Sequence, residues 1–222
     1  IKGSATFNNN QSKNNSQYSN FNLNYHKKNF TQTFSGSYSD NTNVNTTEQE
    51  NFFYSNNARN FINSASNNRY KSPSFSTTSE LEINQKNNIG FIFEYYKSKS
   101  DGESDVDGSN YIDDIFQNSF TTKRNSESNS QNAGSNLFYK YYDKEKNRIL
   151  DVNIGINYRG YKGNTDNFIN YSNNPIITGT RILGNTVERN YYLKIDYSLP
   201  IGTEGSQLEF GGKMDFNNNT NP

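Results

Sequence analysis

The stretch that decides the fold is Leu150-Asp151-Val152-Asn153-Ile154-Gly155-Ile156-Asn157-Tyr158-Arg159, in which apolar residues alternate with polar residues or glycine. Successive side chains of a β-strand point to opposite faces, so this pattern predicts a strand with one apolar face and one polar face. The same period of two recurs at residues 20–25, 30–38, 80–84, 191–199 and 208–216. It is less regular at 89–96 and 137–142, where apolar or aromatic residues occupy both faces. With a short strand near residues 3–8, we expect about nine strands and no long helix.

The composition is polar and yet rich in aromatic residues. Only 30% of the 222 residues are hydrophobic, but the chain contains 17 Tyr and 16 Phe. A soluble domain usually has about 45–50% apolar residues, and a disordered chain has few aromatics. A transmembrane β-barrel accounts for both observations, because only one face of each strand is apolar while the lumen and the loops are in water. The formal net charge is zero and no basic stripe is present, so we expect no nucleic-acid partner.

The connections between the expected strands alternate in length. Short ones are expected at residues 26–29, 86–88, 143–148 and 200–206. Long, polar, Asn-rich loops are expected at about 40–74, 100–130 and 163–188. Outer-membrane barrels have short periplasmic turns and long extracellular loops, so this order assigns each end of the strands to one side of the membrane.

An odd number of strands cannot close a bacterial barrel in the usual way, and an open sheet would expose unpaired backbone groups to lipid. We therefore expect an all-β, antiparallel transmembrane β-barrel fold. Residues 1–222 would form a single unit, a segment of meandering strands from a larger barrel. The competing fold is a soluble β-sandwich or β-solenoid adhesin rich in Asn.

The hairpin at residues 191–213 resembles a known family. Tyr-Tyr-Leu-Lys-Ile-Asp-Tyr-Ser-Leu-Pro-Ile-Gly at 191–202 and Leu-Glu-Phe-Gly-Gly-Lys at 208–213 are similar to the L-x-x-D-Y-x-x-P … L-E-x-G-x-K hairpin. That hairpin belongs to the outer-membrane β-barrel family of Bacteroidota, a branch of the TonB-dependent receptors. Lys2-Gly3-Ser4 and the strand at 20–25 also look like early barrel strands of this family. No plug domain and no TonB-contacting segment is matched.

The resemblance implies a barrel of about 22 strands in the outer membrane of a Gram-negative bacterium, with an N-terminal plug. It implies import of a nutrient, with the class (siderophore, glycan or peptide) left open. The implied partners are outer-membrane lipid, the plug and the remaining barrel strands, the TonB complex, and a surface lipoprotein. The alternative function is a non-energised barrel that displays long surface loops for adhesion or interaction.

One acidic segment is a candidate ion site. Asp101, Glu103, Asp105 and Asp107 stand at alternate positions near glycines, and Ca²⁺ prefers several oxygen ligands in a flexible loop. The segment departs from the EF-hand pattern, because no Glu occupies the twelfth position. We favour a solvated acidic loop over a calcium site, although Asp113 and Asp114 would add further oxygen ligands.

No catalytic or cofactor-binding residue is predicted, and we do not expect an enzyme. The only histidine, His26, falls in an expected tight turn, and the chain has no Cys to form a zinc site with it. Aromatic residues near expected strand ends predict belts at the two membrane interfaces: Tyr25, Phe30, Tyr95, Tyr141, Tyr158 and Tyr197. For three tyrosines of the opposite parity, a belt and a sugar- or peptide-stacking platform in the lumen both remain open: Tyr96, Tyr142 and Tyr192. Charged residues of both signs are expected to face the lumen and to pair across strands: Glu80, Glu82, Glu94, Lys140, Asp151, Arg159, Lys194, Asp196, Glu209, Lys213 and Asp215.

Overall fold

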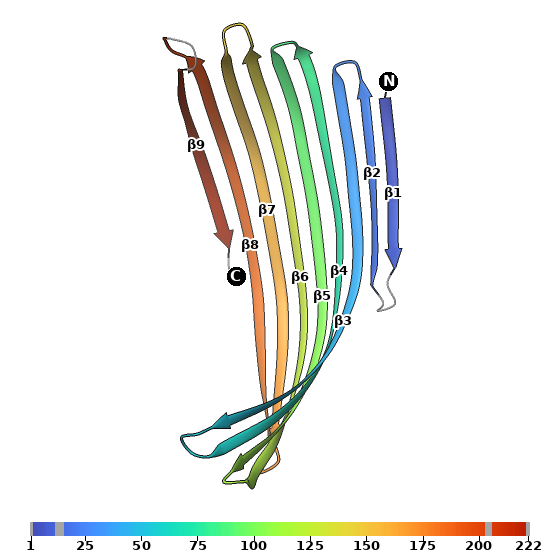
Figure 1. Ribbon diagram of the computed structural model, residues 1–222, viewed down its shortest axis with the longest axis vertical. Coiled ribbons are helices and arrows are strands. Elements are labelled where there is room, and N and C mark those ends of the chain that lie inside the picture. The colour runs from blue at the N-terminus through green and yellow to red at the C-terminus, as the bar shows by residue number, and fades with distance from the viewer. Residues whose placement is uncertain (1, 12–15, 203–205, 221–222) are drawn as a thin grey trace.

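The computed structural model describes residues 2–11, 16–202 and 206–220, and its strands form one antiparallel sheet (Figure 1). The strands are β1 Lys2–Gln11, β2 Gln17–Lys27, β3 Phe30–Phe53, β4 Ala58–Asn84, β5 Asn87–Ile112, β6 Ile115–Asp143, β7 Arg148–Tyr171, β8 Asn174–Pro200 and β9 Gln207–Thr220. Each strand pairs with the next in the chain, so the order in the sheet is the order in the sequence. The prediction of nine meandering antiparallel strands is confirmed. Within the described residues no helix is long and apolar enough to cross a membrane.

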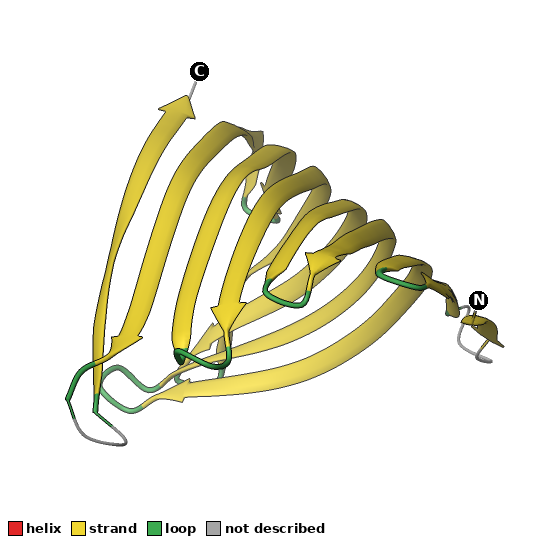
Figure 2. Cartoon of the chain, turned by 90° about the horizontal axis from the view of Figure 1, so that it is seen from above, coloured by secondary structure: helices red, strands yellow, loops and turns green. Residues whose placement is uncertain are grey.

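Seen from above, the sheet is curved and open, with β1 and β9 at its two edges (Figure 2). The strands of the sheet also differ greatly in length. The strands β3 to β8 have 24–29 residues each and continue well past the hairpin of β1 and β2 (Figure 1). At about 3.3 Å per residue, these six strands are roughly 80–95 Å long.

The long loops expected at 40–74, 100–130 and 163–188 are wrong. These residues continue the paired strands, with the register unbroken from Asp40↔Lys71 to Phe53↔Ala58 and from Ser100↔Ser128 to Asn110↔Asn118. The strand pairs β3–β4, β5–β6 and β7–β8 end in tight turns, and we call their ends beyond residues 40, 100 and 163 the long hairpins. The turn between β5 and β6 is formed by Asp113-Asp114, both with positive φ. The polar sequence looked like loop because both faces of these strands are in water, where pairing of the backbone needs no apolar side chain.

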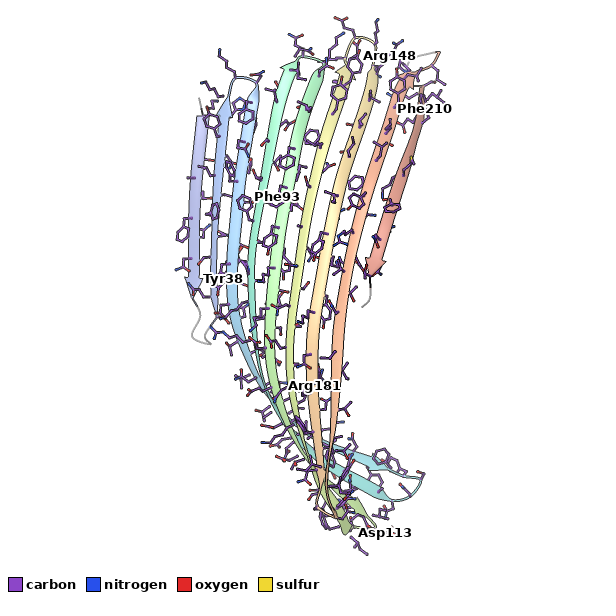
Figure 3. The ribbon with its side chains drawn as sticks, turned by 180° about the vertical axis from the view of Figure 1, so that it is seen from behind. Tyr38, Phe93, Asp113, Arg148, Arg181 and Phe210 are labelled. Atoms are coloured by element: carbon purple, nitrogen blue, oxygen red, sulfur yellow. The ribbon has the colours of Figure 1, made fainter. Side chains whose placement is uncertain are left out.

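The short turns lie together at the other end of the sheet. Turns at residues 28–29, 85–86 and 144–147 agree with the prediction, and the fourth, at 200–206, includes residues 203–205, which lie outside the described part of the chain. His26 is in β2 and not in the turn, because the strand continues to Lys27. Arg148, beside one of these turns, and Asp113, at the tip of a long hairpin, mark the opposite ends of the molecule in Figure 3.

The register divides the side chains between two faces. Residues that pair across successive strands form a row and share a face. One row contains Phe93, Ser135, Ile156, Tyr191 and Phe216. We call its face the apolar face. The next row contains Glu94, Gly134, Asn157, Asn190 and Asn217, and its face is the polar face.

The described residues form no second layer over either face. In the described part of the chain, Phe138 on the polar face is the one buried hydrophobic side chain, at 8% exposure. By contrast Ile154 and Met214, on the apolar face, are 54% and 74% exposed. A soluble protein rarely exposes a continuous apolar surface of this kind, so the apolar face needs an apolar environment outside the chain.

Candidate functional site

The apolar face carries a band of limited height, which we call the apolar band. On β7 it runs from Leu150 to Tyr158, nine residues, or roughly 30 Å along the strand. A tilted transmembrane β-strand needs about 9–11 residues. In the rows of this band, the exposed large hydrophobic side chains all lie on the apolar face: Phe7, Phe21, Leu23, Phe75, Leu81, Ile83, Ile89, Leu137, Ile154, Ile156, Tyr191, Ile195, Phe210, Met214 and Phe216.

Aromatic rows bound the apolar band at both ends. Near the short turns, Tyr141, Tyr197 and Phe210 stand in one row, and Phe210 is labelled there in Figure 3. At the other end, one row contains Tyr95 and Tyr158, together with Phe7, Phe21 and Phe75. Such rings favour the interface between hydrocarbon and water.

The six aromatic residues expected in the belts all lie on the apolar face, as predicted. Tyr25 and Phe30 lie near the turn between β2 and β3, close together, with ring centroids 6.4 Å apart. Tyr96, Tyr142 and Tyr192 lie on the polar face, so they are not part of these belts.

Beyond the second aromatic row the apolar face becomes charged. Six rows beyond the row of Phe93, counting one residue per row, the face carries Asp40, Lys71, Lys99 and Lys162. Two hydrogen bonds join Arg69 to Asp40, from Nε at 2.9 Å and from Nη2 at 2.7 Å. This donation lowers the pKa of Asp40. The change from hydrocarbon-like to charged side chains over a few residues is typical of a membrane boundary.

All eleven charged residues expected in the lumen share the polar face, as predicted. Their pairing differs from the expectation. Lys194–Asp196 and Lys213–Asp215 are ion pairs along a single strand, at 2.6 and 3.0 Å. The cross-strand pair is Arg159–Glu188, at 3.8 Å between Nη1 and Oε2. A Lys reaches a carboxylate two residues away because both side chains stand on the same face of the strand.

The polar face also carries a groove of about 590 Å³ across β4 to β8, which we call the polar groove. Small side chains leave this space open: Ser74 is in one of its two polar rows, and Ser76 and Gly134 are in the other. A Cβ on Gly134 would lie 3.0 Å from Oδ1 of Asn157, so a larger residue here would narrow the groove.

Longer side chains surround this space. Glu94 and Tyr96 contribute a carboxylate and an aromatic ring, and Arg159 and Glu188 contribute the ion pair described above. Nε of Arg159 also donates to Oδ1 of Asn132, at 3.2 Å. The polar groove thus offers donors, acceptors, both charges and a stacking surface, which suits a polar ligand with several hydroxyl or amide groups.

The candidate calcium ligands are not brought together. Asp101, Glu103, Asp105 and Asp107 follow one another at alternate positions of β5, on the apolar face beyond the apolar band. The Cα atoms of consecutive members of this set are about 7 Å apart along an extended strand. Their carboxylates therefore do not surround a common point. In the described residues no group of three or more His, Cys, Asp or Glu side chains is placed to hold a metal ion.

Two further sequence-predicted features have simple surroundings. His26 lies on the polar face, with Nδ1 2.9 Å from the hydroxyl of Thr31 on the paired strand. Asp113 accepts a hydrogen bond from the side chain of Asn57, 2.7 Å away, at the tip of the long hairpins.

The polar groove was missed by the sequence analysis. Its signal was present: the period of two places Ser74, Ser76 and Gly134 beside the charged residues of the lumen face. The grouping was not predicted because it depends on the register of five strands, which the period of two within each strand does not give.

No protein-family model matches the chain, and no curated protein does. Among solved structures, the chain is similar to the ferric yersiniabactin uptake receptor FyuA from Yersinia pestis, with 11% identity and a TM-score of 0.43 over 88% of this chain and 31% of that one. It also matches the siderophore receptor PiuA from Acinetobacter baumannii, with 8% identity and a TM-score of 0.18 over 98% and 45%. A third is the membrane-inserted form of the NetB toxin from Clostridium perfringens, with 8% identity and a TM-score of 0.20 over 94% and 100%. The chain spans less than half of the two receptors' length.

Proposed function

We propose that the chain forms part of the wall of an outer-membrane β-barrel receptor of the TonB-dependent type, of the branch found in Bacteroidota, which imports a nutrient. One observation carries the proposal. The sheet has an apolar band of transmembrane height on one face, bounded by aromatic rows and charged rows, and a polar groove on the other face. Lipid would cover the apolar band, and the polar face would line the lumen.

The edges of the sheet fit this role. In the described sheet β1 and β9 each have a single neighbour, and an unpaired backbone edge in lipid costs several kcal/mol per group. Further barrel strands pairing with both edges would remove that cost. The same proposal includes a plug inside the lumen, the TonB complex as the source of energy, and a surface lipoprotein at the long hairpins.

In this proposal the residues of the polar groove contact the passing nutrient. Glu94 and Arg159 bind its polar groups, and the Tyr96 ring packs against its flat surfaces. The wall itself supplies no energy and carries out no chemistry. Its contribution is to orient the ligand in a water-filled space between the lipid and the plug.

Uptake by whole cells tests this function. Cells with and without the gene would be given radiolabelled ferric siderophores, oligosaccharides and peptides in separate assays. We expect uptake of one class to need the gene, to stop on adding an uncoupler, and to fall several-fold in Arg159→Ala. A matched control is Arg124→Ala, in the long hairpin of β5 and β6. Uptake that persists with the uncoupler would exclude energised transport.

The long hairpins favour a second function, display of a surface for adhesion or interaction. They extend more than ten residues past the charged rows on β3 to β6. If this is the main function, removing these hairpins abolishes attachment to surfaces or partner cells, and deleting the gene leaves the uptake of all three nutrient classes unchanged.

A further inference from the structure

A cluster of positive charge lies on the apolar face at the edge of the apolar band. Arg189 stands in the aromatic row of Tyr158. Lys97 lies two rows further from the short turns, and Lys162 lies two rows beyond Lys97. Lys97 and Lys162 are on β5 and β7, about 10 Å apart across the sheet, with β6 between them. All three side chains are exposed. We call these three residues the basic cluster.

A groove of about 400 Å³ lies between these charges. Lys97 and Lys162 line it, together with the amide side chains of Gln131, Asn129 and Asn185. Every one of these groups can donate a hydrogen bond, and the two lysines add charge. A groove with this lining favours an anion that accepts several hydrogen bonds.

Tyr158 connects the groove to the apolar band. Its ring belongs to the aromatic row, and its hydroxyl lies over Gly160. A Cβ on Gly160 would be only 2.8 Å from this hydroxyl oxygen. The hydroxyl also accepts a hydrogen bond from Nε2 of Gln131, at 3.2 Å. The guanidinium of Arg189 lies 5.9 Å from the centre of the ring. The polar ligand of this groove would therefore lie directly beside the hydrocarbon boundary.

The charges of the cluster are not neutralised. In the three rows that hold Arg189, Lys97 and Lys162, the described residues of β5 to β8 include no acidic side chain on this face. Lys99, by comparison, is paired with Asp101 and Glu127, each at 3.2 Å, and its pKa is raised by these carboxylates. The ion pairs of the described residues include neither Lys97 nor Lys162.

We propose that the basic cluster binds the phosphate of a phosphorylated lipid headgroup in the leaflet on the side of the long hairpins. The inference rests on the proposed function, because the apolar band must first be inserted in a membrane. Charge complementarity decides the occupant. A phosphorylated lipid brings two or more anionic oxygens to this height, with its acyl chains against the apolar band below.

Lipid retention in nanodiscs tests the inference. The full-length protein would be inserted in phosphatidylcholine nanodiscs containing a bisphosphorylated glycolipid (lipid A), and the bound glycolipid would be counted by native mass spectrometry. The variant Lys97→Gln/Lys162→Gln should bind it about 10- to 30-fold more weakly, because each lysine near an anionic surface contributes to binding. The control Lys123→Gln/Lys144→Gln makes the same change of charge in the long hairpin and in a short turn, and should bind as the wild type does.

Two further arms separate the outcomes. A dephosphorylated glycolipid should not be retained, and inorganic phosphate should not displace lipid A at millimolar concentration; displacement would assign the site to free phosphate and overturn the proposal. Insertion is scored separately, by the shift in gel mobility on heating. If the wild type inserts and both double variants retain lipid A equally, the inference is wrong and the proposed function stands. If the wild type does not insert, both are wrong.

Discussion

Arg181 on β8 binds Asp166 on β7 through two hydrogen bonds, from Nε to Oδ1 at 2.6 Å and from Nη2 to Oδ2 at 3.1 Å. The pair lies beyond the apolar band, in the part of the strands where Figure 3 labels Arg181. It shows how the long hairpins hold together without a core: paired backbones carry side chains that bond across the strands. On the polar face near the end of the apolar band, three Ser–Ser pairs between β3 and β4 also bond across the strands, at 2.6, 2.7 and 2.8 Å.

The Asp166–Arg181 pair predicts a loss of order in acid. The hydrogen bond from Arg181 lowers the pKa of Asp166 below its ordinary value of 3.8. A lowered pKa in the folded state adds stability that is complete above the ordinary value and is lost as pH falls through the folded value. A nitroxide at Thr180→Cys should therefore become more mobile below about pH 4. With Asp166→Asn, its mobility should be higher already at neutral pH and change less with acid. A mobility independent of pH in the wild type would contradict the role of the pair.

The two faces of β7 predict opposite effects of the same substitution. Ile154→Arg places a charge in the middle of the apolar band and should lower the free energy of unfolding in lipid vesicles by about 2–4 kcal/mol. Asn153→Arg, one residue away on the polar face, should change it by less than about 1 kcal/mol. Urea titration of the two variants in the same vesicles checks this. Equal losses would show that the two faces do not differ in environment.

Gly155 on the polar face and Gly212 on the apolar face allow a comparison of a packed glycine with an unpacked one. The ring of Tyr192 lies over Gly155, in the space that a Cβ would occupy, whereas a Cβ on Gly212 would have no atom within 4 Å. Gly155→Ala should displace the ring and destabilise the protein by about 1–3 kcal/mol. Gly212→Ala should be neutral or slightly stabilising, since alanine loses less backbone entropy than glycine. The same urea titration measures both, and a larger loss in Gly212→Ala would be inconsistent with the packing.

The long hairpins should be dispensable for membrane insertion. Replacing residues 103–125 by an Asn-Gly turn leaves the pair Gly102↔Ser126 and all pairing within the apolar band. We expect the shortened protein to insert in vesicles and to keep its heat-dependent gel mobility. Deleting residues 91–96 and 132–137 removes six paired residues from each strand inside the apolar band and should abolish insertion. Failure of the first variant would show that the hairpins are part of the membrane fold.

Much of the fold could be predicted from the sequence, because the period of two records which face meets an apolar environment. The residues 150–159 and the eleven charged residues were assigned to the correct faces by parity alone. The period of two no longer identifies a strand where both faces of the strand are in water. At Asp101 to Asp107 and at Asp166, polar residues occupy both parities, and only the pairing of the backbone, which has no signature in side-chain polarity, decides between strand and loop.

The candidate sites depend on register, which a single strand cannot specify. Lys97, Lys162 and Arg189 are far apart in sequence and lie in neighbouring rows because three hairpins end at related heights. The polar groove likewise needs the relative offsets of five strands. Individual side chains were predicted to face the lumen, but their grouping was not.

A nitroxide scan of β7 tests the membrane account most directly. Single cysteines would be placed at each position from 149 to 168 of the protein in lipid vesicles, and the accessibility of each label to oxygen, which concentrates in hydrocarbon, would be compared with its accessibility to a water-soluble nickel chelate. We predict high oxygen accessibility at 150, 152, 154, 156 and 158, high nickel accessibility at the residues between them, and no oxygen preference at any position beyond Lys162. Equal accessibility at neighbouring positions, or an alternation that continues unchanged to residue 168, would contradict a membrane-spanning band on one face of the sheet.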